Sequence, residues 1–305
     1  MPNAKILRIY LDEVPLARAE KGNFNLINRV RAAFEGRGFR VELRKNSEAE
    51  RLKSATRRGY SLFHMDDPFH GRALTLRRAY YYPFWRIESS AKRWEWEIAQ
   101  TPFDPDAIDP AEAAKFGDFW RKKLFGGIQN AGTSPGTVYI PLQGRLLEQR
   151  SFQSLSPVAM IEAVLRQDTE RLIQVAFHPG ETYLQEEIDA VRAVVDRQPR
   201  VTISSEPMAR LLARCDYVAT ENSSVALAGY FFHKPAALFA RIDFHHIAAS
   251  VPHSTVQDAL AAVPDLNPEY DRYLYWFLKQ TTINGGSDQA EAQILHAVRH
   301  RGWDV

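Results

Sequence analysis

Short apolar runs alternate with amphipathic stretches along most of the 305-residue chain. In the first part, apolar runs at 6–11, 39–43 and 60–67 predict strands, the last with a polar tip. Between the first two, apolar positions recur at helical spacing over 25–34 and predict an amphipathic helix. Strands and helices in alternation predict a parallel sheet covered on both faces.

The second half repeats this alternation more regularly. Strands are predicted at 138–142, 173–177, 201–203, 217–220 and 236–239. Helices are predicted at 156–166, 183–196, 207–214 and 223–232. This pattern indicates a doubly wound α/β unit. One more amphipathic helix is predicted over 287–300.

The two halves are separated by a different kind of sequence. Residues 79–126 are rich in aromatic side chains, which indicate either a sugar-stacking surface or a core between domains. The following stretch 125–137 collects Gly, Asn, Ser and Pro, which is typical of a linker or loop. We therefore expect a domain boundary there.

Composition narrows the class of protein. The chain is 45% hydrophobic and 25% charged with a net charge of +2, which indicates a globular protein and gives no support for nucleic-acid binding. The basic run Arg51–Arg58 is either a solvated helix face or a patch for a polyanion or membrane surface. The single cysteine, Cys215, excludes a disulfide framework and a cysteine zinc cluster. The chain shows neither a signal peptide nor a spanning run, so we expect a cytoplasmic protein, with contact at the inner membrane surface as an option.

Polar residues follow four successive predicted strands of the second half. Ligands of open parallel sheets bind at the carboxyl ends of strands, so these positions are the candidate site. The candidates are Gln143; His178, Pro179, Gly180 and Glu181; Ser204 and Ser205; and Glu221, Asn222, Ser223 and Ser224.

The start of the helix at Ser223 has a particular chemistry. Free backbone N–H groups and the positive end of the helix dipole favour an anion there, and the hydroxyls of Ser223 and Ser224 add donors. The pattern therefore predicts a phosphate site. Helix capping by Asn222 or Ser223 alone is the alternative.

Several nucleotide and metal sites are excluded or disfavoured. The sequence contains neither a G-x-G-x-x-G fingerprint nor a P-loop, which argues against a nicotinamide dehydrogenase and a P-loop kinase. Asp104 and Asp106 form a D-x-D pair of the type that holds a metal–diphosphate, but no apolar strand precedes them. We interpret them as a turn before a helix, and we expect no metal and no cofactor.

The segments "FHPGE", "CDYVATENSS" and "ALAGYFFHKPAALF" resemble the capsule polysaccharide biosynthesis family of bacterial glycosyltransferases. The chain is also similar to GT-B sialyltransferases and Kdo transferases that use CMP-sugars. The shared signatures are His178-Pro179, Ser223-Ser224 and an acidic pair before glycine. The acidic pair here is Asp66-Asp67, with Pro68 in place of the glycine. The resemblance covers mainly residues 138–240.

The resemblance implies a GT-B-like α/β fold, in which two Rossmann-like domains with parallel sheets face each other across a cleft. The domains expected are an acceptor domain at 1–132, a donor domain at 133–280 and a C-terminal helix at 281–305 that crosses back onto the first domain. It also implies an inverting, metal-independent enzyme. The donor would be a nucleotide sugar, and the acceptor a glycan or glycolipid.

The expected roles follow the chemistry of a CMP leaving group. His178 as an imidazolium would neutralise or protonate the phosphate, and the serines would hold its oxygens. Asp66 or Asp67 would accept the proton of the acceptor hydroxyl, with His64, His70 and Arg72 as acceptor-side candidates. Two alternatives remain. One is a nucleotide-sugar 2-epimerase, although such enzymes carry Ser-Gly-Gly after the fourth strand. The other is a non-catalytic glycan-binding or capsule-assembly protein.

Overall fold

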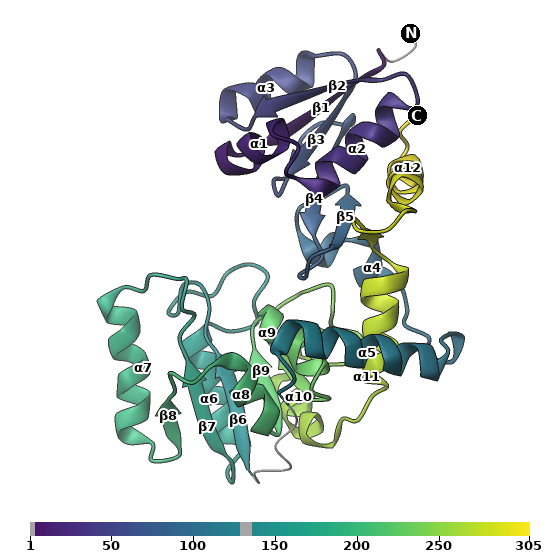
Figure 1. The fold of residues 1–305 in the computed structure, drawn as a ribbon. Helices are drawn as coiled ribbons and strands as arrows, with labels where there is room; N and C mark the ends of the chain where they lie inside the picture. The colour runs from purple at the N-terminus through teal and green to yellow at the C-terminus, as the bar shows by residue number, and fades with distance from the viewer. Residues whose placement is uncertain (1–3, 129–135) are drawn as a thin grey trace. The chain divides into compact units, whose positions relative to one another are not determined.

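The computed structural model describes residues 4–128 and 136–305, and it divides into two compact units (Figure 1). The first unit is Met1–Thr101 together with Phe277–Val305, and the second is Pro102–Trp276. Each unit is built around its own six-stranded sheet. Among the described residues, none of the helices combines the length and the apolar character that crossing a bilayer requires.

The first sheet has the order β12-β5-β4-β3-β1-β2. β1, β2, β3 and β4 run parallel, β5 is antiparallel to β4, and β12 is antiparallel to β5. The strands are β1 (Ile6–Leu11), β2 (Arg40–Lys45), β3 (Tyr60–His64), β4 (Ala73–Arg78), β5 (Phe84–Glu88) and β12 (Ile283–Asn284). The helices are α1 (Glu13–Glu20), α2 (Asn25–Glu35), α3 (Glu48–Thr56), η1 (Arg93–Glu95), α4 (Glu97–Gln100) and α12 (Ala290–His300).

Both ends of the chain contribute to the core of the first unit. Leu26, Ile27, Val30 and Phe34 of α2 are buried together with Ile294, Leu295 and Val298 of α12 and with Trp303. The indole of Trp303 stacks on Tyr60 with 4.4 Å between ring centroids. The C-terminal helix therefore belongs structurally to the N-terminal unit, because it supplies part of the apolar face that covers its sheet.

The second sheet is entirely parallel and has the order β11-β10-β9-β6-β7-β8. Its strands are β6 (Thr137–Pro141), β7 (Leu172–Ala176), β8 (Val201–Ile203), β9 (Tyr217–Thr220), β10 (Ala236–Leu238) and β11 (Ala249–Ser250). The helices are α5 (Pro110–Phe125), α6 (Pro157–Gln167), α7 (Gln185–Arg197), α8 (Met208–Arg214), α9 (Ser224–Tyr230), α10 (Val256–Ala262) and α11 (Tyr270–Leu274). Short helical turns are η2 (Pro105–Ala107), η3 (Val251–His253), η4 (Val263–Asp265) and the π-helical η5 (Tyr275–Gln280).

The predicted fold class is confirmed: the chain has two Rossmann-like units with mainly parallel sheets, and its C-terminal helix returns to the first. Strands β1, β8 and β9 have the predicted bounds. Strands β4 and β5 were not predicted: β5 lies within the aromatic-rich stretch 79–126, and β4 lies just before it. The predicted loop at 125–137 falls mostly on 129–135, outside the described residues.

In the sequence, the borders between the units lie at 101/102 and 276/277, whereas the expected domains had borders at 132/133 and 280/281. The difference at the first border comes from α5, which belongs to the second unit. Gly117 lies so close to Asp271 of α11 that an added Cβ would stand 2.3 Å from its Oδ1. Phe125, at the end of α5, packs against Phe231 and Phe232.

Candidate functional site

The order of the second sheet marks one place for a ligand. From β6 the strands continue to β7 and β8 on one side, and from β9 to β10 and β11 on the other. Ligands of doubly wound sheets bind where the order reverses, beyond the carboxyl ends of the strands. That point lies between β6, which leads into Gln143 and Gly144, and β9, which leads into Glu221.

Glu221 is the most unusual residue at this point. It is only 4% exposed, and neither oxygen of its carboxyl group has a hydrogen-bond partner among the described residues. Its backbone is fixed, since its carbonyl oxygen accepts from the N–H of Ala240 at 3.0 Å. Burial raises the pKa of Glu221 to about 8, and the charge of Arg150 only partly offsets this. At neutral pH the carboxyl group therefore keeps its proton and has both a donor and an acceptor unused.

Arg150 and Gln153 lie in the loop after β6 and were not predicted. Gly144 has a φ of +73°, and a Cβ there would come within 2.8 Å of Arg150 Nη2, so glycine leaves room for the guanidinium. The side-chain oxygen of Gln153 accepts from the backbone N–H of Arg150 at 2.8 Å. Its amide nitrogen is buried and has no partner within the described chain. The site thus combines a cation with buried polar groups that are not saturated.

His178 follows β7 and is exposed. Its Nδ1 accepts from the N–H of Gly180 at 3.1 Å, which leaves Nε2 as the ring nitrogen that can donate to a ligand. A Cβ on Gly180 would lie 3.2 Å from His178 Cε1, a tight contact that the ring would have to relieve by shifting slightly. The backbone N–H of His178 donates to the Tyr183 hydroxyl at 3.0 Å, and that hydroxyl donates to the carbonyl of Leu142 at 3.3 Å.

The acids near His178 hold the loop after β6 in place. Glu181 accepts from the backbone N–H of Gly144. Glu187 accepts from the N–H of Leu146 at 2.6 Å and from the N–H of Leu184 at 2.9 Å. In this structure Glu181 therefore positions the strand end, a role that the sequence did not indicate.

The two serines at the start of α9 differ in their contacts. Ser223 is the N-cap, 4% exposed, and its hydroxyl accepts from the N–H of Val225 at 3.3 Å. Ser224 is exposed, and its hydroxyl has no partner in the described ranges. Asn222 is half-buried between them and Glu221. The capping interpretation thus holds for Ser223, while Ser224 is available to a ligand.

The other predicted residues of this unit follow strands that lie progressively farther from the reversal point in the sheet. Gln143 is half-buried beside it, and Pro179 is exposed next to His178. Ser204 and Ser205 follow β8, which is separated from β9 by β7 and β6. The hydroxyl of Ser204 accepts from the N–H of Glu206 at 3.2 Å. These two serines therefore stand at the edge of the sheet.

The first sheet has its own reversal point, between β1 and β3. Asp12 follows β1, Asn46 follows β2, and Asp66 follows the end of β3. The side-chain amide of Asn46 donates to Asp12 Oδ1 at 3.0 Å and also to Asp66 Oδ2. Arg51 Nη1 lies 3.7 Å from Asp66 Oδ2. Asp12 and Asn46 were missed, although both stand just after predicted strands.

The other first-unit candidates have separate contacts. Asp67 accepts from the N–H of Ala91 and thereby fixes the loop after β5. His64 is half-buried, and burial lowers its pKa, while Asp12 and Asp66 act in the opposite direction. His70 Nε2 meets Ser54 Oγ at 3.1 Å and its Nδ1 accepts from the N–H of Arg72 at 3.2 Å.

Arg72 donates to the carbonyl oxygens of Ala55 and Arg57 at 2.9 and 3.1 Å. His70 and Arg72 therefore join the end of α3 to the loop before β4. His64 and Asp66 are the predicted residues that lie at the reversal point.

The D-x-D pair forms the expected turn. Asp104 accepts from the N–H of Asp106 at 3.0 Å, and Asp109 caps α5 by accepting from Ala111 and Glu112. Over residues 4–128 and 136–305, no group of three or more His, Cys, Asp or Glu side chains is arranged to hold a metal ion.

Comparison with known proteins adds evidence at the level of the fold. No family model and no curated protein matches the sequence. The β-Kdo 2,7 transferase of Thermosulfurimonas dismutans KpsC is 11% identical, with a TM-score of 0.55 over 95% of this chain and 98% of that one. The β-Kdo 2,4 transferase of the same KpsC is 11% identical with a TM-score of 0.43, covering 84% and 89%.

The UDP-GlcNAc 2-epimerase of Neisseria meningitidis, bound to UDP-GlcNAc, is 10% identical with a TM-score of 0.36, covering 97% and 99%. At 11% identity, the likeness to the β-Kdo 2,7 transferase concerns the fold alone. The chain therefore has the two-domain GT-B fold that is found in the β-Kdo 2,7 transferase.

Proposed function

We propose that the protein is an inverting, metal-independent glycosyltransferase that moves an acidic, Kdo- or sialic-acid-like sugar from a CMP-sugar to a surface glycan or glycolipid in capsule or exopolysaccharide synthesis. The observation that carries this proposal is the unsaturated polar cluster at the reversal point of the second sheet. Glu221, His178 and Ser224 all have hydrogen-bonding capacity there that the described chain does not use. The two-domain GT-B fold, which a β-Kdo 2,7 transferase also has, supports an enzyme that acts on a nucleotide sugar.

The second unit would bind the donor. Ser224, beside the start of α9, would donate to a phosphate oxygen of CMP, and His178 would donate from Nε2. Arg150 would add positive charge next to the loop after β6. These donors would stabilise the negative charge that develops on the phosphate as its bond to the anomeric carbon breaks.

The first unit would supply the base. An inverting transfer needs one group to accept the proton of the acceptor hydroxyl while that oxygen attacks the anomeric carbon. We assign this to Asp66, because it lies at the reversal point of the first sheet with Asp12 and Asn46. Asp67 would position the loop at Ala91 instead. His64 would line the acceptor side.

Nucleotide binding is the first test of this function. CMP at about one hundred times its dissociation constant should stabilise the protein by about 2.7 kcal/mol and raise its melting temperature clearly, more than UDP or GDP does. The rise should persist in EDTA. The Ser224→Ala variant should melt like the wild type without ligand, because Ser224 is exposed, and should show a smaller rise with CMP.

The possible outcomes separate the competing functions. If no nucleotide changes the melting temperature, the donor site is wrong. If EDTA abolishes the rise and Mg²⁺ restores it, metal independence is wrong. If CMP binds but no CMP is released from a CMP-sugar with any glycan acceptor, a non-catalytic binding protein replaces the transferase. A larger shift with UDP would favour a 2-epimerase.

A further inference from the structure

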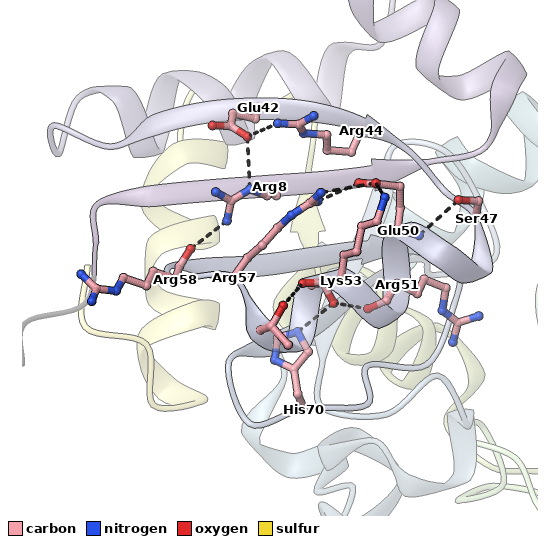
Figure 2. A network of polar contacts seen from close by, with 12 residues as sticks. Arg8, Glu42, Arg44, Ser47, Glu50, Arg51, Lys53, Arg57, Arg58 and His70 are labelled. Atoms are coloured by element: carbon pink, nitrogen blue, oxygen red, sulfur yellow. Dashed lines mark hydrogen bonds and ion pairs between the residues drawn. The ribbon is translucent and has the colours of Figure 1, made fainter.

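Apart from Arg51, which lies beside Asp66, the basic run Arg51–Arg58 has no role in the proposed reaction. It forms most of α3, the helix that follows β2 in the chain, and the turn that leads to β3. Figure 2 shows the polar network around it. We use the name basic face for the side chains Lys5, Arg37, Arg40, Glu42, Arg44, Glu48, Glu50, Leu52, Lys53, Arg57 and Arg58; Arg8 is buried beneath it.

One carboxylate forms ion pairs with three arginines at the edge of the sheet. Glu42 of β2 lies 3.1 Å from Arg8, 2.7 Å from Arg40 and 2.7 Å from Arg44. Burial tends to raise the pKa of Glu42, but the three arginines hold it below its usual value. Glu42 therefore stays ionised and balances only one of the three positive charges.

A second carboxylate is shared in the same way on α3. Glu50 lies 2.7 Å from Arg57 and 3.3 Å from Lys53. Arg58 has no carboxylate partner in the described chain, and in Figure 2 its guanidinium points away from the other labelled residues. Lys5 and Arg37, which meet beside the starts of β1 and β2, likewise have no carboxylate partner there.

The basic face thus carries seven cations against three carboxylates, Glu42, Glu48 and Glu50. The whole chain has a net charge of only +2, so the rest of the molecule is net negative. Such a concentrated excess attracts a polyanionic surface, and the attraction acts over roughly a Debye length, about 8 Å at physiological salt.

An exposed apolar side chain distinguishes between possible partners. Leu52 of α3 is 63% exposed and lies between Arg51 and Lys53 in the chain. Inserted below a layer of lipid headgroups, a leucine gains up to about 1.5–3 kcal/mol, while the flanking cations remain at the phosphates. A nucleic-acid backbone offers Leu52 no comparable apolar environment.

We propose that the basic face docks the first unit on an anionic phospholipid surface, with Leu52 inserted into the interface. The cations would pair with headgroup phosphates, each contributing about 1 kcal/mol near an anionic membrane. This docking does not depend on the donor site, so CMP binding and vesicle binding can fail separately.

Vesicle sedimentation of the full-length protein tests the proposal. The wild type should bind vesicles of phosphatidylcholine with phosphatidylglycerol, bind pure phosphatidylcholine weakly, and dissociate as salt is raised. Reversing two exposed cations, Lys53→Glu with Arg58→Glu, should weaken binding at least about tenfold, given about 1 kcal/mol per charge. The matched control reverses two exposed cations of the second unit, Lys122→Glu with Arg192→Glu, and should bind like the wild type.

Leu52→Ser separates insertion from simple charge attraction. It should weaken binding to the anionic vesicles and leave unchanged any binding to duplex DNA of matched charge. Equal melting temperatures of all variants would establish that they fold. The proposal is wrong if the wild type does not bind anionic vesicles, if both double variants bind equally, or if Leu52→Ser has no effect on vesicle binding.

Discussion

Replacing Glu221 with glutamine should leave the protein more stable than the wild type at pH 8 and above. The folded protein holds the carboxyl proton up to about pH 8, whereas the unfolded chain releases it near the ordinary value of 4.5. The wild type therefore loses stability as the pH rises from 4.5 to 8, by about 4 kcal/mol at roughly 1.4 kcal/mol per pKa unit. Glutamine has a similar shape and does not titrate, so the free energy of unfolding of the variant should not fall in this way as the pH rises.

Denaturant unfolding between pH 4.5 and 9 measures this effect. The difference in free energy of unfolding between Glu221→Gln and the wild type should grow with pH and level off above pH 8. Glu148→Gln is the matched control: Glu148 is 57% exposed beside Arg145, and its replacement should change stability by less than about 1 kcal/mol at every pH. Parallel curves for Glu221→Gln and the wild type would mean that Glu221 is ionised in the folded protein.

Replacing His178 with alanine should reduce turnover by about 10²–10⁴-fold, the usual share of a positioned proton donor. The fold should be unaffected, because His178 is exposed and the change should cost less than about 1 kcal/mol. The loss should appear mainly in kcat, since the donor acts on charge that develops in the transition state. CMP release from a CMP-sugar with acceptor measures it.

Two further variants test whether His178 acts as a neutral hydrogen-bond donor or as an imidazolium acid. His178→Gln keeps an N–H donor without an acid and should recover part of the lost rate if the neutral ring donates from Nε2. Gly180→Ala places a Cβ 3.2 Å from His178 Cε1 and should lower the rate by displacing the ring. Wild-type turnover of His178→Ala would reduce His178 to a turn residue.

The strand ends of the second sheet could be predicted because the sequence there is regular. Each strand is a short apolar run, and the polar residue that follows it is visible as a break in the pattern. The same rule would have found Asp12 in the first sheet, where a strand ends at Leu11. Asn46 was less visible, since the predicted strand ends at Leu43 and β2 continues through the polar residues Arg44 and Lys45.

Other features depend on contacts between distant parts of the chain. The charge of Arg150 acts on Glu221 from a loop about seventy residues earlier in the chain, and no local pattern predicts where that loop lies. β5 was missed because Arg86 and Glu88 interrupt its apolar character although both are buried. Glu88 pairs with Arg301 at 2.5 Å, a partner that lies beyond α12. The exposed Nε2 of His178, by contrast, follows from local geometry with Gly180.

The division of the first unit between both chain ends has a consequence for synthesis on the ribosome. The second unit is continuous, so all of it has emerged before the last residues of the first. At about 5–20 residues per second, the first hundred residues wait roughly 10–40 s for α12 and Trp303. During that time the apolar surface of α2 and the edge of β5 lack their final partners, and exposed surfaces of this kind are prone to aggregate.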